Sequence, residues 1–302
     1  MLGQKLKRRL TRYGLLRGTL AEGTSQDIAR VRAAATKPEA ASETAQTEAR
    51  RLINALPKSQ IDTFRNAFDP KHVRAGHYKN ATSLHLFVHI PKTAGSALLF
   101  GLRDGFEAVT PIPYDRAPDA LADAMQSLNS VEQVTRSHVL IGHFNWRAAY
   151  TFFRDNSGLR AASMIRNPAD RLLSQYLYNG SKAHPAHLEF RARFPKFQTY
   201  LDTVSPNFQL QQMAGNGDFS RRLFRLGRYY TFLGVTEHFG ASLAHYSRSH
   251  ALPEMREHVV NVAAKTPWQD VELTTELREE IYLKHAQDWA LYSLLEPMFR
   301  GA

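Results

Sequence analysis

The chain has 302 residues, of which 43% are hydrophobic, and this is enough for one sizeable core. Its 39 Lys and Arg residues outnumber its 28 Asp and Glu residues, so the formal net charge of +11 favours an anionic partner. Because the chain has no cysteine, disulfides and cysteine-based zinc sites are excluded. No apolar run approaches the ~18 residues that a membrane span needs.

Residues 1–79 are predicted to form a basic helical N-terminal extension and linker. Leucines from Leu2 to Leu20 recur at roughly helical spacing with basic residues between them. This pattern fits peripheral contact with an anionic membrane, or docking of a helix on the chain's own domain. Residues 21–48, rich in Ala, Thr, Ser and Glu, are typical of a linker or a marginal helix, and residues 49–68 are more helix-like. The segment lacks the continuous apolar core of a signal peptide, so we expect a cytoplasmic protein.

Residues 80–302 are predicted to form one α/β domain. Helical patterns follow Gly95 and Pro168 and also occupy residues 186–203. They alternate with short apolar runs, which indicates a central parallel sheet flanked by helices. The expected strands are 84–90, 109–112, 137–141, 161–165 and 230–235. Because ligands of such sheets bind beyond the carboxyl ends of the strands, residues directly after each strand are candidates for a site.

The first candidate site is the turn after the first expected strand, made of Pro91, Lys92, Thr93, Ala94, Gly95 and Ser96. Free backbone N–H groups at the start of the following helix can bind an anion, and Gly95 permits close backbone approach. Lys92 adds a positive charge, while Thr93 and Ser96 add hydroxyl donors. The G-x-x-x-x-G-K-[ST] pattern of nucleoside triphosphatases is absent. The alternative is an ordinary strand-to-helix turn with a solvated lysine.

The second candidate site follows the strand expected at 161–165. Asn167 suits a helix N-cap and Pro168 suits the first helical position. Arg166, at the strand end, is placed to meet a phosphate through two parallel hydrogen bonds. Arg171 and Ser174 are three residues apart and therefore lie on neighbouring parts of the helix surface. The alternative is that Arg171 pairs with a carboxylate and Ser174 faces solvent.

Two segments carry a resemblance to a known family. "FVHIPKTAGSALL" (87–99) and "MIRNPADRLLSQYLY" (164–178) look like the signature segments of sulfotransferases that use 3'-phosphoadenosine 5'-phosphosulfate. The chain is most similar to the carbohydrate branch, notably the uronosyl 2-O-sulfotransferases. The resemblance covers about residues 84–295 and includes "NFQLQQMAG", "FLGVTEHFGASL" and "VNVAAKTPW…DWALYSL". In that family the first segment cradles the 5'-phosphosulfate, and the second binds the 3'-phosphate through an arginine and a serine that match Arg166 and Ser174.

The resemblance implies transfer of a sulfuryl group to an acceptor hydroxyl on a carbohydrate or glycoconjugate, with release of 3'-phosphoadenosine 5'-phosphate. Lys92 would neutralise charge that develops between the phosphate and the departing sulfuryl group, and Ser96 would orient the phosphosulfate. No metal is required by the family. Eukaryotic members carry an N-terminal membrane anchor that is not found here, which favours a bacterial relative. No nucleic-acid partner is expected, since no recognised binding module is present.

The acceptor hydroxyl needs a base, and histidine suits this role at neutral pH. His143 follows the strand expected at 137–141 and resembles the glycine–histidine that supplies the base in the uronosyl branch. Its alternative role is structural, bonded to a loop carbonyl. His138 precedes the strand core and is interpreted as structural, while His89 is expected to support the loop from beneath. Glu237, after the strand at 230–235, is the rival base.

Two other classes of function stay open. A P-loop-like kinase acting on a small molecule would depend on a metal and bind a nucleoside triphosphate. A non-catalytic protein that binds a polyanion or a membrane surface would use the net charge, but it leaves Arg166 and Ser174 without a shared purpose.

Overall fold

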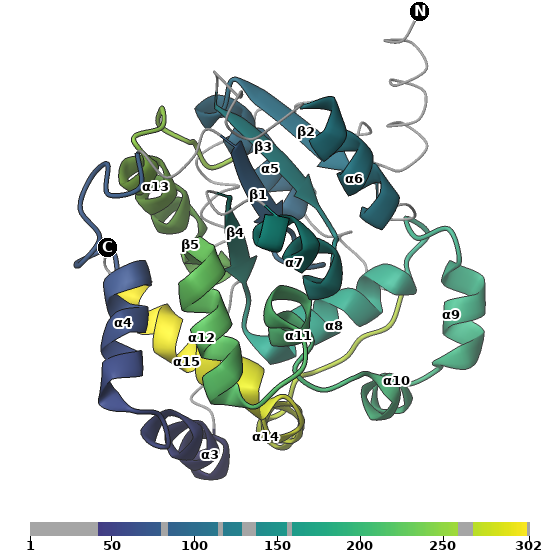
Figure 1. Ribbon diagram of the computed structural model, residues 1–302. Helices are drawn as coiled ribbons and strands as arrows, with labels where there is room; N and C mark the ends of the chain where they lie inside the picture. Colours follow the sequence, from purple (N-terminus) through teal and green to yellow (C-terminus); the bar gives the residue numbers. More distant parts are fainter. Residues whose placement is uncertain are drawn as a thin grey trace, which may run out of the picture.

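The computed structural model describes residues 42–79, 84–113, 117–128, 137–155, 159–258 and 268–300. The predicted amphipathic basic segment from Leu2 to Leu20 lies outside these ranges. Helices α13 (Phe239–His250) and α15 (Ala286–Phe299) pack against β5 (Tyr230–Val235), as Figure 1 shows.

A five-stranded sheet in the order β2-β3-β1-β4-β5 forms the centre of the molecule, and every pair in it is parallel. The predicted α/β class with a parallel sheet flanked by helices is therefore confirmed (Figure 1). All of the expected strands form, each with ends within two residues of the expectation. They are β1 (Leu84–Val88), β2 (Ala108–Ile112), β3 (His138–Gly142), β4 (Arg160–Ile165) and β5 (Tyr230–Val235).

The alternation of side chains along β1 divides the core into two layers. Leu84, Leu86 and Val88 belong to a cluster on one face of the sheet, whereas Phe87 belongs to the cluster on the other face. Helices α5 (Gly95–Gly105) and α13 (Phe239–His250) cover the Phe87 face. The opposite face is covered by α4 (Lys58–Phe68), α6 (Ala117–Ser127), α7 (Trp146–Asp155), α11 (Phe208–Ala214), α12 (Phe219–Tyr229) and α15 (Ala286–Phe299).

A third hydrophobic cluster is centred on Tyr176, beyond the carboxyl ends of the strands. It is built by α8 (Pro168–Asn179), α9 (His187–Arg193), α10 (Phe197–Thr203) and α14 (Thr275–Lys284). The helical pattern expected at 186–203 is two helices, because Pro195 cannot donate a backbone hydrogen bond and separates α9 from α10. A 3-10 turn, η3 (Thr236–His238), follows β5.

The N-terminal helix α3 (Glu43–Asn54) begins inside the stretch that was expected to be a linker. Ala45 and Ala49 are buried, and α3 packs on α14 and α15. Residues 43–48 are therefore helical, which is the second of the two interpretations given for this stretch, and their small side chains permit close packing on α14 and α15. Pro57 separates α3 from α4 and precedes the first turn of α4. The boundary between residues 79 and 80 stays a prediction, and α3 and α4 share buried clusters with the later helices.

No helix within the described ranges is long and apolar enough to cross a membrane.

Close packing of α3 gives a stability prediction. Ala49→Leu inserts three carbon atoms where the side chain is only 3% exposed, so we expect the free energy of unfolding to fall by about 1–3 kcal/mol. Thr47→Leu places the same residue on the exposed face of α3 and should change it by less than about 0.5 kcal/mol. Urea unfolding of the two variants and the parent measures both values. Equal stability of the two variants would contradict the packing of α3.

Candidate anion-binding site

The loop after β1 has an unusual backbone. Lys92 has a φ of 72° and Ala94 a φ of 59°, a region that residues other than glycine seldom occupy. Ala94 is the N-cap of α5, and no side chain caps this helix. The N–H groups in the first turn of an α-helix have no acceptor within the helix, and the partial positive charge of the helix N-terminus adds to their attraction for an anion. Backbone strain of this kind is commonly kept at ligand sites.

Thr93 has a different role from the one that the sequence suggested. Its side chain is fully buried, and its hydroxyl donates to the Ile90 carbonyl at 2.8 Å instead of facing an anion. The Thr93 N–H also donates to the Ile90 carbonyl, at 3.3 Å. Both bonds close the turn directly after β1. The Thr93 hydroxyl therefore has a structural role and is not directed toward a ligand, because the tight turn places this side chain in the interior.

Gly95 is needed because of a protein contact that the sequence did not reveal. A Cβ atom on Gly95 would lie 2.1 Å from His89 Cε1 and 2.2 Å from His89 Nε2. The His89 ring thus lies directly against the first residue of α5, as expected for a residue that supports the loop from beneath. A side chain at position 95 would displace this ring, whether or not a ligand is bound.

Two positive charges converge on the loop. Arg166, which follows β4, donates from Nη1 to the Lys92 carbonyl at 3.2 Å, and the Lys92 ammonium lies 4.1 Å from the centre of the Tyr178 ring. Burial, and then the charge of Arg166, lower the pKa of Lys92 to about 8. Within the described ranges neither cation forms an ion pair with a carboxylate. An anion would relieve the repulsion between them.

Gln209 fixes the backbone of Arg166, and the sequence had not marked it as a site residue. Its side-chain oxygen accepts from the Arg166 N–H at 2.9 Å, and its amide nitrogen donates to the Arg166 carbonyl at 2.8 Å. The Gln209 side chain is 1% exposed, so these bonds are shielded from water. Only the segment "NFQLQQMAG" pointed to this region in advance.

Helix α8 begins as the sequence predicted. The Asn167 side chain accepts from the N–H groups of Ala169 and Asp170, and Pro168 occupies the first turn. Ser174 is partly exposed on the same helix, without a described hydrogen bond. Arg171 is buried, and its guanidinium lies 4.8 Å from the centre of the Phe208 ring. Arg171 is therefore part of the packing, while a role for Ser174 in binding stays a prediction.

His143 lies beside the loop, directly after β3. Its Nδ1 donates to the His89 carbonyl at 3.0 Å, and the centres of the two imidazole rings are 4.4 Å apart. This bond places the proton on Nδ1 and the basic lone pair of the neutral ring on Nε2. Burial lowers the pKa of His143, and the bond to the His89 carbonyl opposes this effect. The ring is therefore neutral at pH 7, as a base must be before it accepts a proton. His138 lies at the other end of β3 and bonds to Thr110 at 2.8 Å.

Glu237, the rival base, is directed into the protein. Its Oε1 accepts from the Asn167 N–H at 2.8 Å, and its Oε2 is buried without a partner. Burial raises the pKa of Glu237 to about 7, and the Asn167 N–H and the charge of Arg166 oppose this rise. The carboxyl thus supports the residue next to Arg166, and the atom that could take a proton is closed off from solvent.

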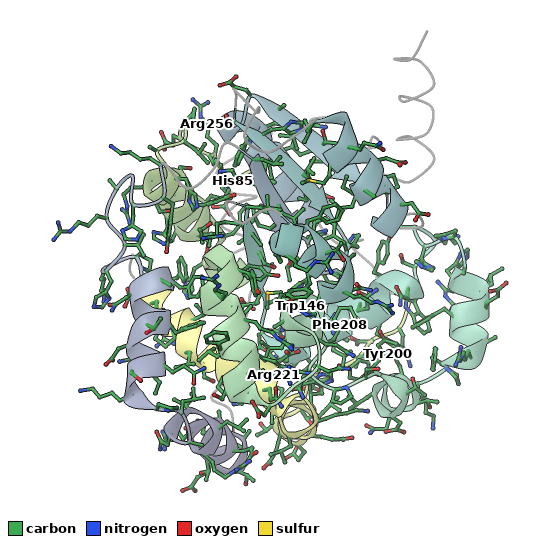
Figure 2. All side chains as sticks on the ribbon, viewed as in Figure 1. His85, Trp146, Tyr200, Phe208, Arg221 and Arg256 are labelled. Carbon is green, nitrogen blue, oxygen red and sulfur yellow. The ribbon has the colours of Figure 1, made fainter. Side chains whose placement is uncertain are left out.

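Figure 2 shows side chains at the two ends of the central strands. His85, from the amino end of β1, lies in the upper part of the view, whereas Trp146, which follows β3, and Phe208, at the start of α11, lie near the middle. A separate groove of about 730 Å³ lies between α4 and α12, and it is lined in part by Phe64, Arg221 and Phe224. None of the predicted site residues lines this groove.

In the described part of the chain, no group of three or more His, Asp or Glu side chains is arranged to hold a metal ion.

Comparisons with known proteins give similarities to solved structures alone. No family model matches the chain, and no curated protein matches it. A similar solved structure is that of mouse sulfotransferase SULT7A1 complexed with PAP, with a TM-score of 0.37 and 11% sequence identity. The match covers 64% of this chain and 64% of that chain, which is less than two thirds of the length of the mouse protein. Similarity at this level identifies neither a family nor a substrate for this chain.

The raised pKa of Glu237 gives a prediction about stability. The unfolded chain releases the Glu237 proton near the ordinary pKa of 4.5, whereas the folded protein releases it only near pH 7. The free energy of unfolding therefore falls as the pH rises from 4.5 to about 7, because the unfolded state ionises first. Glu237→Gln keeps an oxygen for the Asn167 N–H and cannot ionise. We therefore expect the melting temperature of this variant, minus that of the parent, to increase from pH 5 to pH 8, as measured by calorimetry.

The exposed Glu254 provides the control, because Glu254→Gln removes the same charge from the surface. A Glu237→Gln difference that stays constant from pH 5 to pH 8 would show that burial does not perturb this carboxyl.

Proposed function

We propose that this protein transfers a sulfuryl group from 3'-phosphoadenosine 5'-phosphosulfate to an acceptor hydroxyl. The observation that supports this most is the meeting of three strand ends at one loop: Lys92 after β1, His143 after β3 and Arg166 after β4. The loop places the N-terminus of α5 beside two cations, and neither cation pairs with a carboxylate among the described residues. This arrangement suits a ligand with two anionic groups. The resemblance of both segments to sulfotransferases supports this choice of ligand.

In the proposed reaction the acceptor oxygen bonds to sulfur as the bond between sulfur and the 5'-phosphate oxygen breaks. The acceptor proton passes to Nε2 of His143, and 3'-phosphoadenosine 5'-phosphate leaves. Lys92 stabilises the charge that develops on the bridging oxygen, and the N–H groups at the start of α5, with Ser96, orient the phosphosulfate. Arg166 and Ser174 hold the 3'-phosphate.

The acceptor in this proposal is a sugar hydroxyl, on a carbohydrate or glycoconjugate, because the two segments resemble those of the carbohydrate branch most. Basic and aromatic residues after α8, in "NGSKAHPAHLEFRARFPKF", would line the approach for such an acceptor. Mass spectrometry of candidate glycans incubated with the donor tests this directly, since transfer adds one sulfuryl mass. Failure of every glycan while a small hydroxylated molecule is sulfated would overturn the choice of acceptor and keep the reaction.

The first prediction from this proposal concerns the nucleotide. The protein should bind 3'-phosphoadenosine 5'-phosphate much more tightly than adenosine 5'-phosphate, and Arg166→Ala should remove most of this preference. Loss of hydrogen bonds to a charged phosphate corresponds to about 1.5–3 kcal/mol, or roughly 10- to 100-fold in affinity. Calorimetry with both nucleotides measures the preference. Arg160→Ala, at the opposite end of β4, is the matched control and should leave it unchanged.

Equal affinity of the parent for both nucleotides would contradict a 3'-phosphate site. Tight binding of adenosine triphosphate with Mg²⁺ in the same experiment would support the kinase alternative instead.

The second prediction concerns the base. His143→Ala should leave the affinity for 3'-phosphoadenosine 5'-phosphate nearly unchanged and lower turnover about 10²- to 10⁴-fold, because a general base is lost. Since burial lowers the pKa of His143, the parent rate should fall only below the pH at which a free imidazole would become protonated. His138→Ala, at the start of the strand that precedes His143, is the control. Near-normal turnover of a folded His143→Ala protein would assign the base elsewhere, with Glu237 tested next.

A further inference from the structure

His89 contacts both halves of the proposed site. One edge of its ring lies against Gly95, where an added Cβ would meet Cε1 at 2.1 Å, and the ring is also 4.4 Å from that of His143. Its carbonyl accepts the Nδ1 proton of His143 at 3.0 Å, and its own N–H donates to the Gly142 carbonyl at 2.9 Å. His89 thus contacts Gly95, the first residue of α5, and it also contacts Gly142, the last residue of β3, and His143, which follows β3.

We propose that His89 is a positioning residue that couples the donor loop to the base. This inference rests on the proposed function and goes beyond it, because it states how one half of the site controls the other. The His89 ring lies against Gly95 and beside the His143 ring, so it is close to both. A shift of the loop when the donor binds moves the ring, and the ring then fixes the orientation of His143.

The surroundings of His89 exclude a direct chemical role for its side chain. Nε2 is buried and has no hydrogen-bond partner, so a reacting group cannot reach it in this conformation. Burial, with His143 and Lys92 as further causes, lowers the pKa of His89 well below its ordinary value, so the ring is neutral and repels neither neighbour. A neutral ring whose Nε2 has no polar contact influences its neighbours only by the space that it occupies. This leaves positioning as its role.

The test uses the full chain and two substitutions on opposite sides of the contact. Gly95→Ala drives a methyl group into the His89 ring, whose atoms are the nearest to it, and His89→Ala removes the ring while keeping the carbonyl. The state of His143 is followed by ¹⁵N NMR of its imidazole in the unliganded protein, which distinguishes the Nδ1–H form from the Nε2–H form. Affinity for 3'-phosphoadenosine 5'-phosphate is measured by calorimetry on the same samples.

We expect Gly95→Ala to shift the His143 ring nitrogens and to weaken nucleotide binding by roughly tenfold. His89→Ala should replace the single Nδ1–H form of His143 with a mixture. In the double variant, Gly95→Ala should add little to either effect, since the ring that its methyl group displaces is gone. His138 is the first residue of β3 and bonds to Thr110, so His138→Ala should alter neither readout.

Two results would overturn the inference. One is a Gly95→Ala protein in which the His143 nitrogens are unchanged, and the other is fully additive effects in the double variant. Both can be read without an acceptor and without enzyme activity. If the parent fails to bind 3'-phosphoadenosine 5'-phosphate, the proposed function fails, whereas the NMR result still decides whether His89 positions His143.

Discussion

Parallel pairing of β1 between β3 and β4 is the constraint on which the site depends. The register aligns Val88 with Gly142 on one side and with Ser163 on the other, so all three strands end at the same edge. The Ser163 hydroxyl adds a bond to the Val88 carbonyl at 2.7 Å, within the buried sheet. A shift of one residue in either pairing would turn the side chains of that strand to the opposite face and separate His143 or Arg166 from the loop.

The two cations at the site, Lys92 and Arg166, repel each other, and Lys92 is also partly removed from water. Lys92 and Arg166 lie close enough for the charge of Arg166 to contribute to the lowered pKa of Lys92, and burial adds the larger part. A bound anion near Lys92 would offset the repulsion by Arg166 and the loss of water around the ammonium. Binding of a phosphate or sulfate group should therefore raise the pKa of Lys92 toward its ordinary value. Until then the ammonium lies against the Tyr178 ring, which stabilises a cation without introducing a carboxylate that would compete with the ligand.

The sequence was sufficient for features that depend on local order. Continuous apolar runs located all of the strands, and the Asn167-Pro168 pair located the start of α8. It was insufficient where a residue's role depends on contacts from elsewhere in the chain. Thr93 has the residue type of an anion ligand, yet the turn directs its hydroxyl to Ile90. Gly95 suggested ligand approach, whereas the structure shows that the His89 ring occupies the space.

The position of Arg166 depends on a helix almost at the end of the chain. Gln209 holds both backbone groups of Arg166, and the N–H groups of Gln209 and Leu210 donate to the Asp288 carboxylate at 3.0 Å and 2.8 Å. Asn207, in the left-handed conformation, accepts in turn from the Asp288 N–H at 3.2 Å. Helices α11 and α15 thus cap each other. Because this buried exchange fixes Gln209, α15 helps to hold Arg166 at the loop after β1, although no residue of α15 belongs to the proposed site.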